Sequence, residues 1–214
     1  MRKNGMKREI KEKSKCTTLE TPSGVLSDEA IVRAVIAGDA ECYGELVDRY
    51  EAKLLRYARV LLHDGDDAKD AVQEAFVSAY RNLERFDPER RFSSWIYRIV
   101  HNVARNIALK RKFLFFLSPE EWIKKGETIA DGEASLEAQL EESELKADVR
   151  RYIKELPGAY RDPLILFYLE EKAYDEIAEI LNMPLGTVGT RISRAKKMIR
   201  ERLHGSSKSW KTLI

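Results

Sequence analysis

Hydrophobic residues recur along this chain with the spacing of α-helices, and no stretch shows the alternation of a β-strand. Ser27 is placed to cap a first helix, which Gly38 is predicted to end. A long second helix is predicted from an apolar stripe made of Tyr43, Leu46, Val47, Tyr50, Leu54, Tyr57, Ala58 and Leu61. The polar residues His63 to Asp66 then predict a turn.

Two further helices follow the same period. One spans about Asp67 to Leu83, with a predicted buried stripe of Ala68, Ala71, Val72, Ala75, Phe76, Ala79 and Tyr80. After the loop Phe86 to Arg91, the other runs from about Ser93 to Lys112, with Ile96, Ile99, Val100, Val103 and Ile107 inward. The pattern predicts a small helical domain over residues 25–112, preceded by a disordered basic tail, 1–24.

The helical period weakens over residues 113–142, which we interpret as an acidic linker. The stretch from Glu120 to Asp148 holds ten acidic residues against three lysines. Helical pattern returns at Glu144, breaks at Leu156-Pro157, and is predicted to restart at Asp162-Pro163 with proline at the first helical position. The chain is therefore predicted to be all-α, with a second small helical domain at 143–205 and a C-terminal tail at 206–214.

Charge is distributed unevenly, although the net charge is only +2. Arg90 to Lys112 contains seven basic residues and no acidic one, and Gly186 to Leu203 contains six basic residues and one acid. The small net charge does not indicate a general polyanion binder. Two basic segments separated by an acidic one are typical of two distinct nucleic-acid contacts.

The clearest motif lies between Tyr174 and Leu203. A short helix, YDEIAEIL, is followed by the turn NMPLG and a longer basic helix, TVGTRISRAKKMIRERL, which is the helix-turn-helix plan. Thr187 is predicted to cap the second helix. The side chains predicted to face duplex DNA are Thr187, Thr190, Arg191, Arg194 and Lys197. A plain helical hairpin with a solvated basic face is the alternative.

Three segments, AKDAVQEAF, NLERFDPERRFSSWIYRIVHNVARN and YDEIAEILNMPLGTVGTRISRAKK, resemble extracytoplasmic-function sigma factors of the sigma-70 family in order and spacing. The resemblance covers roughly Leu26 to Leu203. It implies sigma domains 2 and 4, and a subunit that directs RNA polymerase to promoters and assists initiation and melting. Gly189 departs from the family, in which this position is often basic or polar.

The resemblance also implies roles for matching residues. The polar face Asp70, Gln73 and Glu74 would dock on the clamp helices of the polymerase β′ subunit. The −10 promoter element would be bound by Phe86, Arg91, Arg98, Asn102, Arg105 and Asn106, and the −35 element by the five helix-turn-helix residues. Trp95 and Tyr97 could stack on bases, but a core position is favoured for Trp95 and Phe92. His101 is interpreted as an exposed neutral histidine.

The implied partners are core RNA polymerase (β′ clamp helices and β flap), promoter DNA as duplex and melted strand, and an anti-sigma factor, which holds many relatives inactive. Phe113 to Leu117 would pack on the first domain or bind polymerase or an inhibitor. The sequence predicts no catalytic site, metal or cofactor, because His63, His101 and His204 form no ligand spacing. No apolar run reaches membrane-spanning length, so a cytoplasmic protein is predicted.

Two other classes of protein remain open on the residues alone. A conventional repressor or activator would use the N-terminal helices as a dimerisation or ligand module. A helical adaptor would use neither basic face for DNA. The first explains the helix-turn-helix but not the asparagine–arginine surface after the loop.

Overall fold

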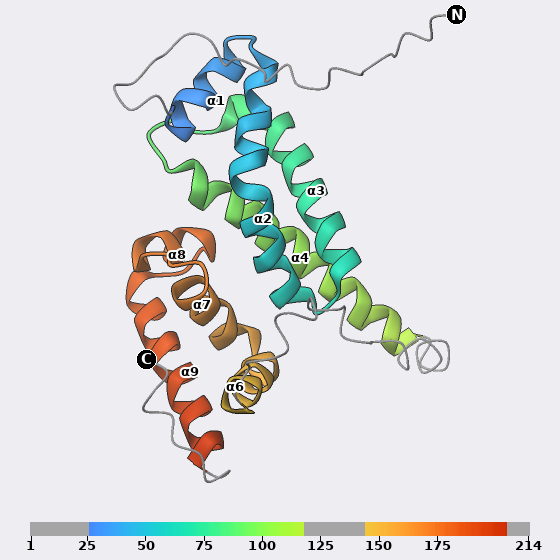
Figure 1. Cartoon of the computed structure of the whole chain (residues 1–214), viewed down its shortest axis with the longest axis vertical. Helices are drawn as coiled ribbons and strands as arrows, with labels where there is room; N and C mark the ends of the chain where they lie inside the picture. The colour runs from blue at the N-terminus through green and yellow to red at the C-terminus, as the bar shows by residue number, and fades with distance from the viewer. Residues whose placement is uncertain (1–25, 118–143, 205–214) are drawn as a thin grey trace, which may run out of the picture.

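The structure, a computed structural model, describes residues 26–117 and 144–204, and within these ranges it contains helices and no strand (Figure 1). The N-terminal domain consists of α1 (Asp28–Ile36), η1 (Ala40–Cys42), α2 (Tyr43–Leu62), α3 (Gly65–Arg81), η2 (Leu83–Arg85) and α4 (Phe92–Leu117). The C-terminal domain consists of α6 (Glu144–Glu155), α7 (Gly158–Tyr168), α8 (Tyr174–Ile180) and α9 (Leu185–His204). The predicted all-α class is confirmed. The tails, 1–24 and 206–214, and nearly all of the predicted linker lie outside the described residues.

Local signals in the sequence fix the ends of the first helices. The Ser27 hydroxyl accepts a hydrogen bond from the Ala30 amide at 3.2 Å, which confirms the predicted cap of α1. Gly38 follows that helix at φ 110°, a backbone conformation that glycine adopts without strain. The Asp64 side chain accepts from the amides of Asp66 and Asp67 and so caps α3.

The predicted apolar stripes of α2, α3 and α4 meet in the core of the N-terminal domain, where Leu54, Tyr57 and Ile96 have no exposed surface. Tyr80 is an exception, because its predicted burial is wrong and the residue is 47% exposed. One residue along a helix rotates the side chain by about 100°, so Tyr80 turns away from the buried Ala79. Its ring lies 5.0 Å from that of Tyr43 at the surface.

Three predicted helix ends differ from the structure. The chain enters α7 at Gly158, directly after Pro157, and Pro163 lies buried inside this helix instead of starting it. Similarly, α9 begins at Leu185 after Pro184, so Thr187 is a residue of its first turn and not its cap. At its C-terminal end, α4 continues to Leu117 instead of ending near Lys112, so residues 113–117 are helical. Phe113 is 63% exposed, so it does not pack back on the N-terminal domain.

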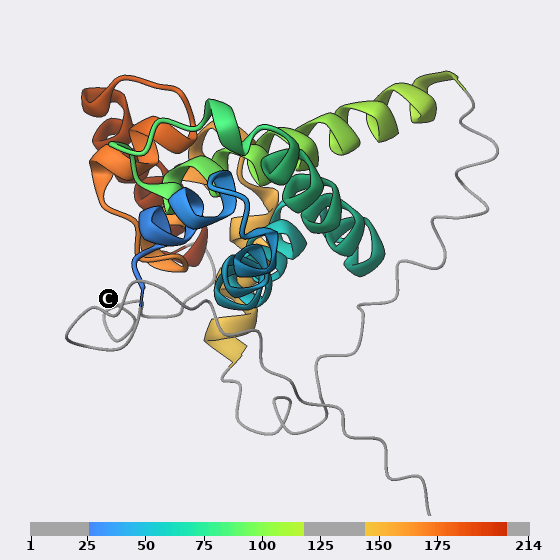
Figure 2. The same ribbon diagram turned by 90° about the horizontal axis from the view of Figure 1, so that it is seen from above.

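The two domains lie side by side. Both views show α7, α8 and α9 packed on one side of α2 and α4, with α3 on the opposite side (Figures 1 and 2). Contacts between the domains are made by α4 with α8 and by α2 with α7. This arrangement brings the helix-turn-helix close to the segment that follows the loop at residues 86–91.

Candidate nucleic-acid interface

Four polar residues of α4 share one face of that helix. Asn102, Arg105 and Asn106 are exposed and Arg98 is half-buried, while Ile96 and Val100 on the other side enter the core. Spacings of three, four and seven residues align side chains on a helix. The face combines two guanidinium groups with two amides, which can hold phosphates and pair with base edges.

The loop before α4 holds one aromatic residue whose predicted role does not fit its position. Phe86 is only 5% exposed, and its ring centroid lies 5.1 Å from that of Trp95 and 5.9 Å from that of Phe92. Buried in this aromatic cluster, Phe86 is a core residue and cannot contact the −10 element as predicted. The favoured core position is confirmed for Phe92, which has no exposed surface, while Trp95 is partly buried and packs against the core.

Arginine side chains make up the exposed basic surface of the same loop. Arg90 and Arg91 are both exposed, and each approaches a carboxylate of the C-terminal domain. Tyr97, considered above as a stacking residue, is 1% exposed and donates a hydrogen bond to Glu170. The ring of Tyr97 is therefore unavailable to bases in this arrangement.

The helix-turn-helix forms as predicted, with α8 and α9 joined by a tight turn. Thr190, Arg194 and Lys197 are exposed on α9, and Thr187 and Arg191 are half-buried. Packing accounts for glycine at position 189, because a Cβ atom there would lie 3.3 Å from Cε2 of Tyr174 on α8. In this chain the absent side chain leaves room for the ring of Tyr174 against α9.

The third predicted surface lies on α3. Asp70, Gln73 and Glu74 are all exposed, as is Val77 one turn further along. Their spacing places two carboxylates and an amide on one face of α3, the helix that lies across α2 and α4 from α7–α9 (Figure 1).

His101 lies in the core, so the predicted exposed state is wrong. The residue is 8% exposed, and Nδ1 lies 3.0 Å from the hydroxyl of Tyr57. Burial lowers the pKa of His101, against an opposing effect of Asp162. The predicted neutral form is consistent with this direction.

We expect the buried His101 to make the fold less stable in mild acid. The pKa of His101 is lower in the folded than in the unfolded chain. Its contribution to the free energy of unfolding is therefore complete above about pH 6.5, and it is lost as the pH falls toward the pKa of the folded state. His101→Gln keeps a hydrogen-bonding partner for Tyr57 and should flatten the drop in stability between about pH 7 and pH 5. Urea unfolding at both pH values measures this change in the free energy of unfolding.

The control for this expectation is His63→Gln, which removes a histidine from the surface. The pKa of His63 is also lowered, first by burial, but its side chain is more exposed, so this variant should keep most of the acid sensitivity. Equal pH dependence in the wild type and the His101→Gln variant would contradict the assignment.

Over residues 26–117 and 144–204, no group of three or more histidine, cysteine or carboxylate side chains is arranged to hold a metal ion. Among the described helices, none combines the length and apolar character that a membrane span requires.

Comparisons with known proteins assign both domains to described families. The Sigma-70 region 2 family matches residues 46–113, and the Sigma-70 region 4 family matches residues 146–199. Among solved structures, CnrH in complex with the cytosolic domain of CnrY aligns at a TM-score of 0.62 and 25% identity, covering 84% of this chain and 99% of that one. The sigma factor RpoE of Bartonella quintana shares the fold at a TM-score of 0.59 and 23% identity, covering 76% of this chain and 96% of that one.

Curated relatives are similar over most of their length. The ECF RNA polymerase sigma factor SigW of Bacillus subtilis is 36% identical, over 80% of this chain and 94% of that protein. The ECF RNA polymerase sigma-E factor of Escherichia coli K12 is 35% identical, over 81% and 93% respectively. The chain therefore belongs to the extracytoplasmic-function RNA polymerase sigma factors of the sigma-70 family.

Proposed function

We propose that each of the three exposed surfaces has one role in promoter recognition. Asp70, Gln73 and Glu74 on α3 bind the β′ clamp helices of core polymerase, and the C-terminal domain contacts the β flap. Arg91 and the α4 residues Arg98, Asn102, Arg105 and Asn106 hold the −10 element as it melts. Thr187, Thr190, Arg191, Arg194 and Lys197 on α9 bind the −35 duplex. The chain acts in the cytoplasm as an initiation subunit, and the polymerase supplies the catalysis.

One observation carries this proposal: the two basic faces belong to different domains of a chain whose family directs RNA polymerase to promoters. A face of arginine and asparagine on α4 suits an opened strand, while the helix-turn-helix of α8 and α9 suits a duplex. A repressor or an adaptor needs only one of these surfaces or neither, so the sigma-factor role explains more of the molecule.

The proposal predicts that the free chain binds promoter DNA weakly. Mounting both domains on one polymerase makes the second DNA contact nearly intramolecular, so modest individual affinities suffice. Run-off transcription with purified core polymerase and genomic fragments identifies a promoter, and a titration of that promoter with and without core tests the tethering. Equal affinity in both titrations would reject it.

Replacing Arg191 by alanine should weaken binding of the −35 duplex by about 1–3 kcal/mol if the guanidinium reads a base. The measurement is promoter binding by the reconstituted holoenzyme on templates that differ at single −35 positions. Arg33→Ala, which removes an exposed arginine from α1, serves as the matched control. An unchanged −35 preference in the Arg191 variant would remove this residue from the contact set.

We also propose that an anti-sigma factor controls the chain. The similar protein CnrH was solved bound to the cytosolic domain of CnrY, and its fold covers most of this chain. A groove of about 590 Å³ between the domains offers a site, with Ile153, Leu164 and Ile199 among its apolar residues. None of the described residues that line it is acidic, and its lysines and arginines are Arg56, Arg59, Lys154, Lys196 and Arg200. The groove thus suits an amphipathic helix with acidic flanks.

A further inference from the structure

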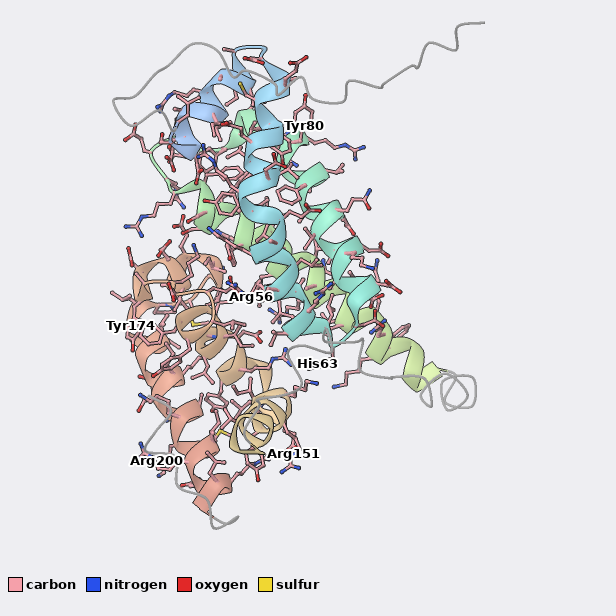
Figure 3. The ribbon with its side chains drawn as sticks, in the orientation of Figure 1. Arg56, His63, Tyr80, Arg151, Tyr174 and Arg200 are labelled. Carbon is pink, nitrogen blue, oxygen red and sulfur yellow. The ribbon has the colours of Figure 1, made fainter. Side chains whose placement is uncertain are left out.

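Helix α1 lies against α2 and against the beginning of α4. It contacts α2, α4 and η2, and both ribbon views show it next to the N-terminal end of α4 (Figures 1 and 2). Side chains fill the space between these helices (Figure 3). Ile31 and Val32 of α1 have no exposed surface, so this helix is fixed in the core of the N-terminal domain. The charged residues of its first turn are therefore held in place relative to α4.

Asp28 joins the first turn of α1 to α2. Its carboxylate accepts hydrogen bonds from a guanidinium nitrogen of Arg49 at 2.9 Å and from the hydroxyl of Tyr50. The same nitrogen of Arg49 donates to the carbonyl of Leu26 at 2.7 Å. The start of α1 is thus fixed on α2 by several polar contacts.

Glu29, the next residue, contacts the first residue of α4. Its Oε1 atom accepts a hydrogen bond from the Phe92 amide at 3.3 Å. The first amides of an α-helix have no carbonyl partner within the helix, and the N-terminus of the helix carries a partial positive charge. The carboxylate of Glu29 therefore caps α4 from a different helix.

Both acidic residues of α1 act on Phe92. The Phe92 amide donates to Glu29, which fixes the backbone. The ring of Phe92 lies 5.7 Å from that of Tyr50, and the hydroxyl of Tyr50 donates to Asp28. The start of α4 is consequently held by its backbone and by its side chain.

The loop that ends at this contact is short. Residues 87–91 lie between Phe86 and Phe92, which are both buried. The Phe92 amide belongs to the peptide unit that joins Phe92 to Arg91, a proposed contact of the −10 element. Glu29 therefore fixes the backbone from which the side chain of Arg91 extends.

We propose that Glu29 is a positioning residue for the −10 element. By capping α4, it holds the loop at residues 86–91 and the first turn of α4 in the geometry that receives the opened strand. Glu29 acts through the backbone at Phe92 and does not touch DNA itself. This role rests on the −10 function proposed above for Arg91 and for α4.

The test is binding of a labelled single-stranded oligonucleotide to the reconstituted holoenzyme. The oligonucleotide carries the −10 strand of the promoter that run-off transcription identifies. Glu29→Ala should weaken this binding about fivefold, the factor that corresponds to a helix cap worth about 1 kcal/mol. Glu29→Gln keeps an acceptor oxygen and should lose less. Both variants should bind core polymerase as the wild type does, because the face of α3 is unchanged.

The matched control is Asp64→Ala, because Asp64 is also a carboxylate that caps a helix. It accepts from the amides of Asp66 and Asp67 at the start of α3, and it also pairs with Arg111. Under conditions where all variants are folded, Asp64→Ala should lower the free energy of unfolding at least as much as Glu29→Ala does. It should nevertheless bind the −10 strand as the wild type does. Equal weakening by both variants would reduce the effect of Glu29 to one of general stability and overturn its positioning role.

Amide hydrogen exchange of the free full chain gives a second readout, which needs no promoter. Glu29→Ala should speed exchange over residues 87–92, because the Phe92 amide loses its acceptor. Asp64→Ala should leave exchange in this segment unchanged. Unchanged exchange in the Glu29 variant would show that the cap does not hold the loop.

Asn102→Ala, which removes a proposed −10 contact, separates the positioning role from the proposed function. Weaker strand binding by Asn102→Ala but not by Glu29→Ala would overturn the positioning role and leave the proposed function intact. Faster exchange in Glu29→Ala, with normal strand binding by both variants, would support the cap and reject the proposed −10 surface. Tighter strand binding by Glu29→Ala would mean that a phosphate replaces the carboxylate at the end of α4, which contradicts a positioning role.

Discussion

A chain in which Asp70 and Glu74 are both replaced by arginine is expected to lose association with core RNA polymerase. The two carboxylates lie exposed one turn apart on α3, so a partner that pairs with them must present positive charge. Reversal turns attraction into repulsion at both positions, which we expect to cost about 3 kcal/mol, roughly a hundredfold in affinity. Binding of labelled chain to core polymerase at moderate salt measures the loss.

The matched control reverses Glu41 and Glu51, two exposed carboxylates of the same domain that lie outside the proposed docking face. This variant has the same net charge as the first, so it should retain polymerase binding if the position of the charge matters. Circular dichroism of both proteins verifies that α3 remains helical. Equal affinities for the two variants would move the docking surface away from α3.

Helix α2 shows which part of the fold the sequence could predict. Its apolar residues recur with the helical period over twenty residues, and polar residues flank both ends of the helix. Only one face of such a helix is apolar, so the sequence determines which residues are buried. Pro163 shows the opposite case. Proline is compatible with the start of a helix, yet here the signal at Pro157 determines the start and Pro163 is buried within α7. Competing local signals are resolved only by packing.

The candidate site was predictable where exposure follows from helical period, as for Asn102 and Arg105. Phe86 was misassigned because a loop aromatic can face solvent or core, and only the positions of Phe92 and Trp95 decide between them. Glu170 could not be found from sequence at all. Its partner Arg56 is 114 residues away, and no local pattern encodes a contact that depends on how two domains meet.

Replacing Phe92 by alanine is expected to destabilise the N-terminal domain by about 3–5 kcal/mol, the range for truncating a buried phenylalanine. Phe92 has no exposed surface, and its ring packs between Tyr50 at 5.7 Å and Trp95 at 5.8 Å. The cavity left behind adds to the lost transfer free energy, because neighbours fixed on α2 and α4 cannot collapse into it. Urea unfolding followed by circular dichroism measures the change.

The same substitution at Phe113 separates the effect of burial from that of residue type. Phe113 lies on α4 as well but is 63% exposed, so Phe113→Ala should change the free energy of unfolding by no more than about 0.5 kcal/mol.

Because the ring of Phe92 also packs at 5.9 Å from that of Phe86, the loss of Phe92 should loosen the loop that carries Arg90 and Arg91. Promoter opening should then fall even under conditions where the variant is fully folded. A Phe92 variant as stable as the Phe113 variant would show that the aromatic cluster does not support the −10 surface.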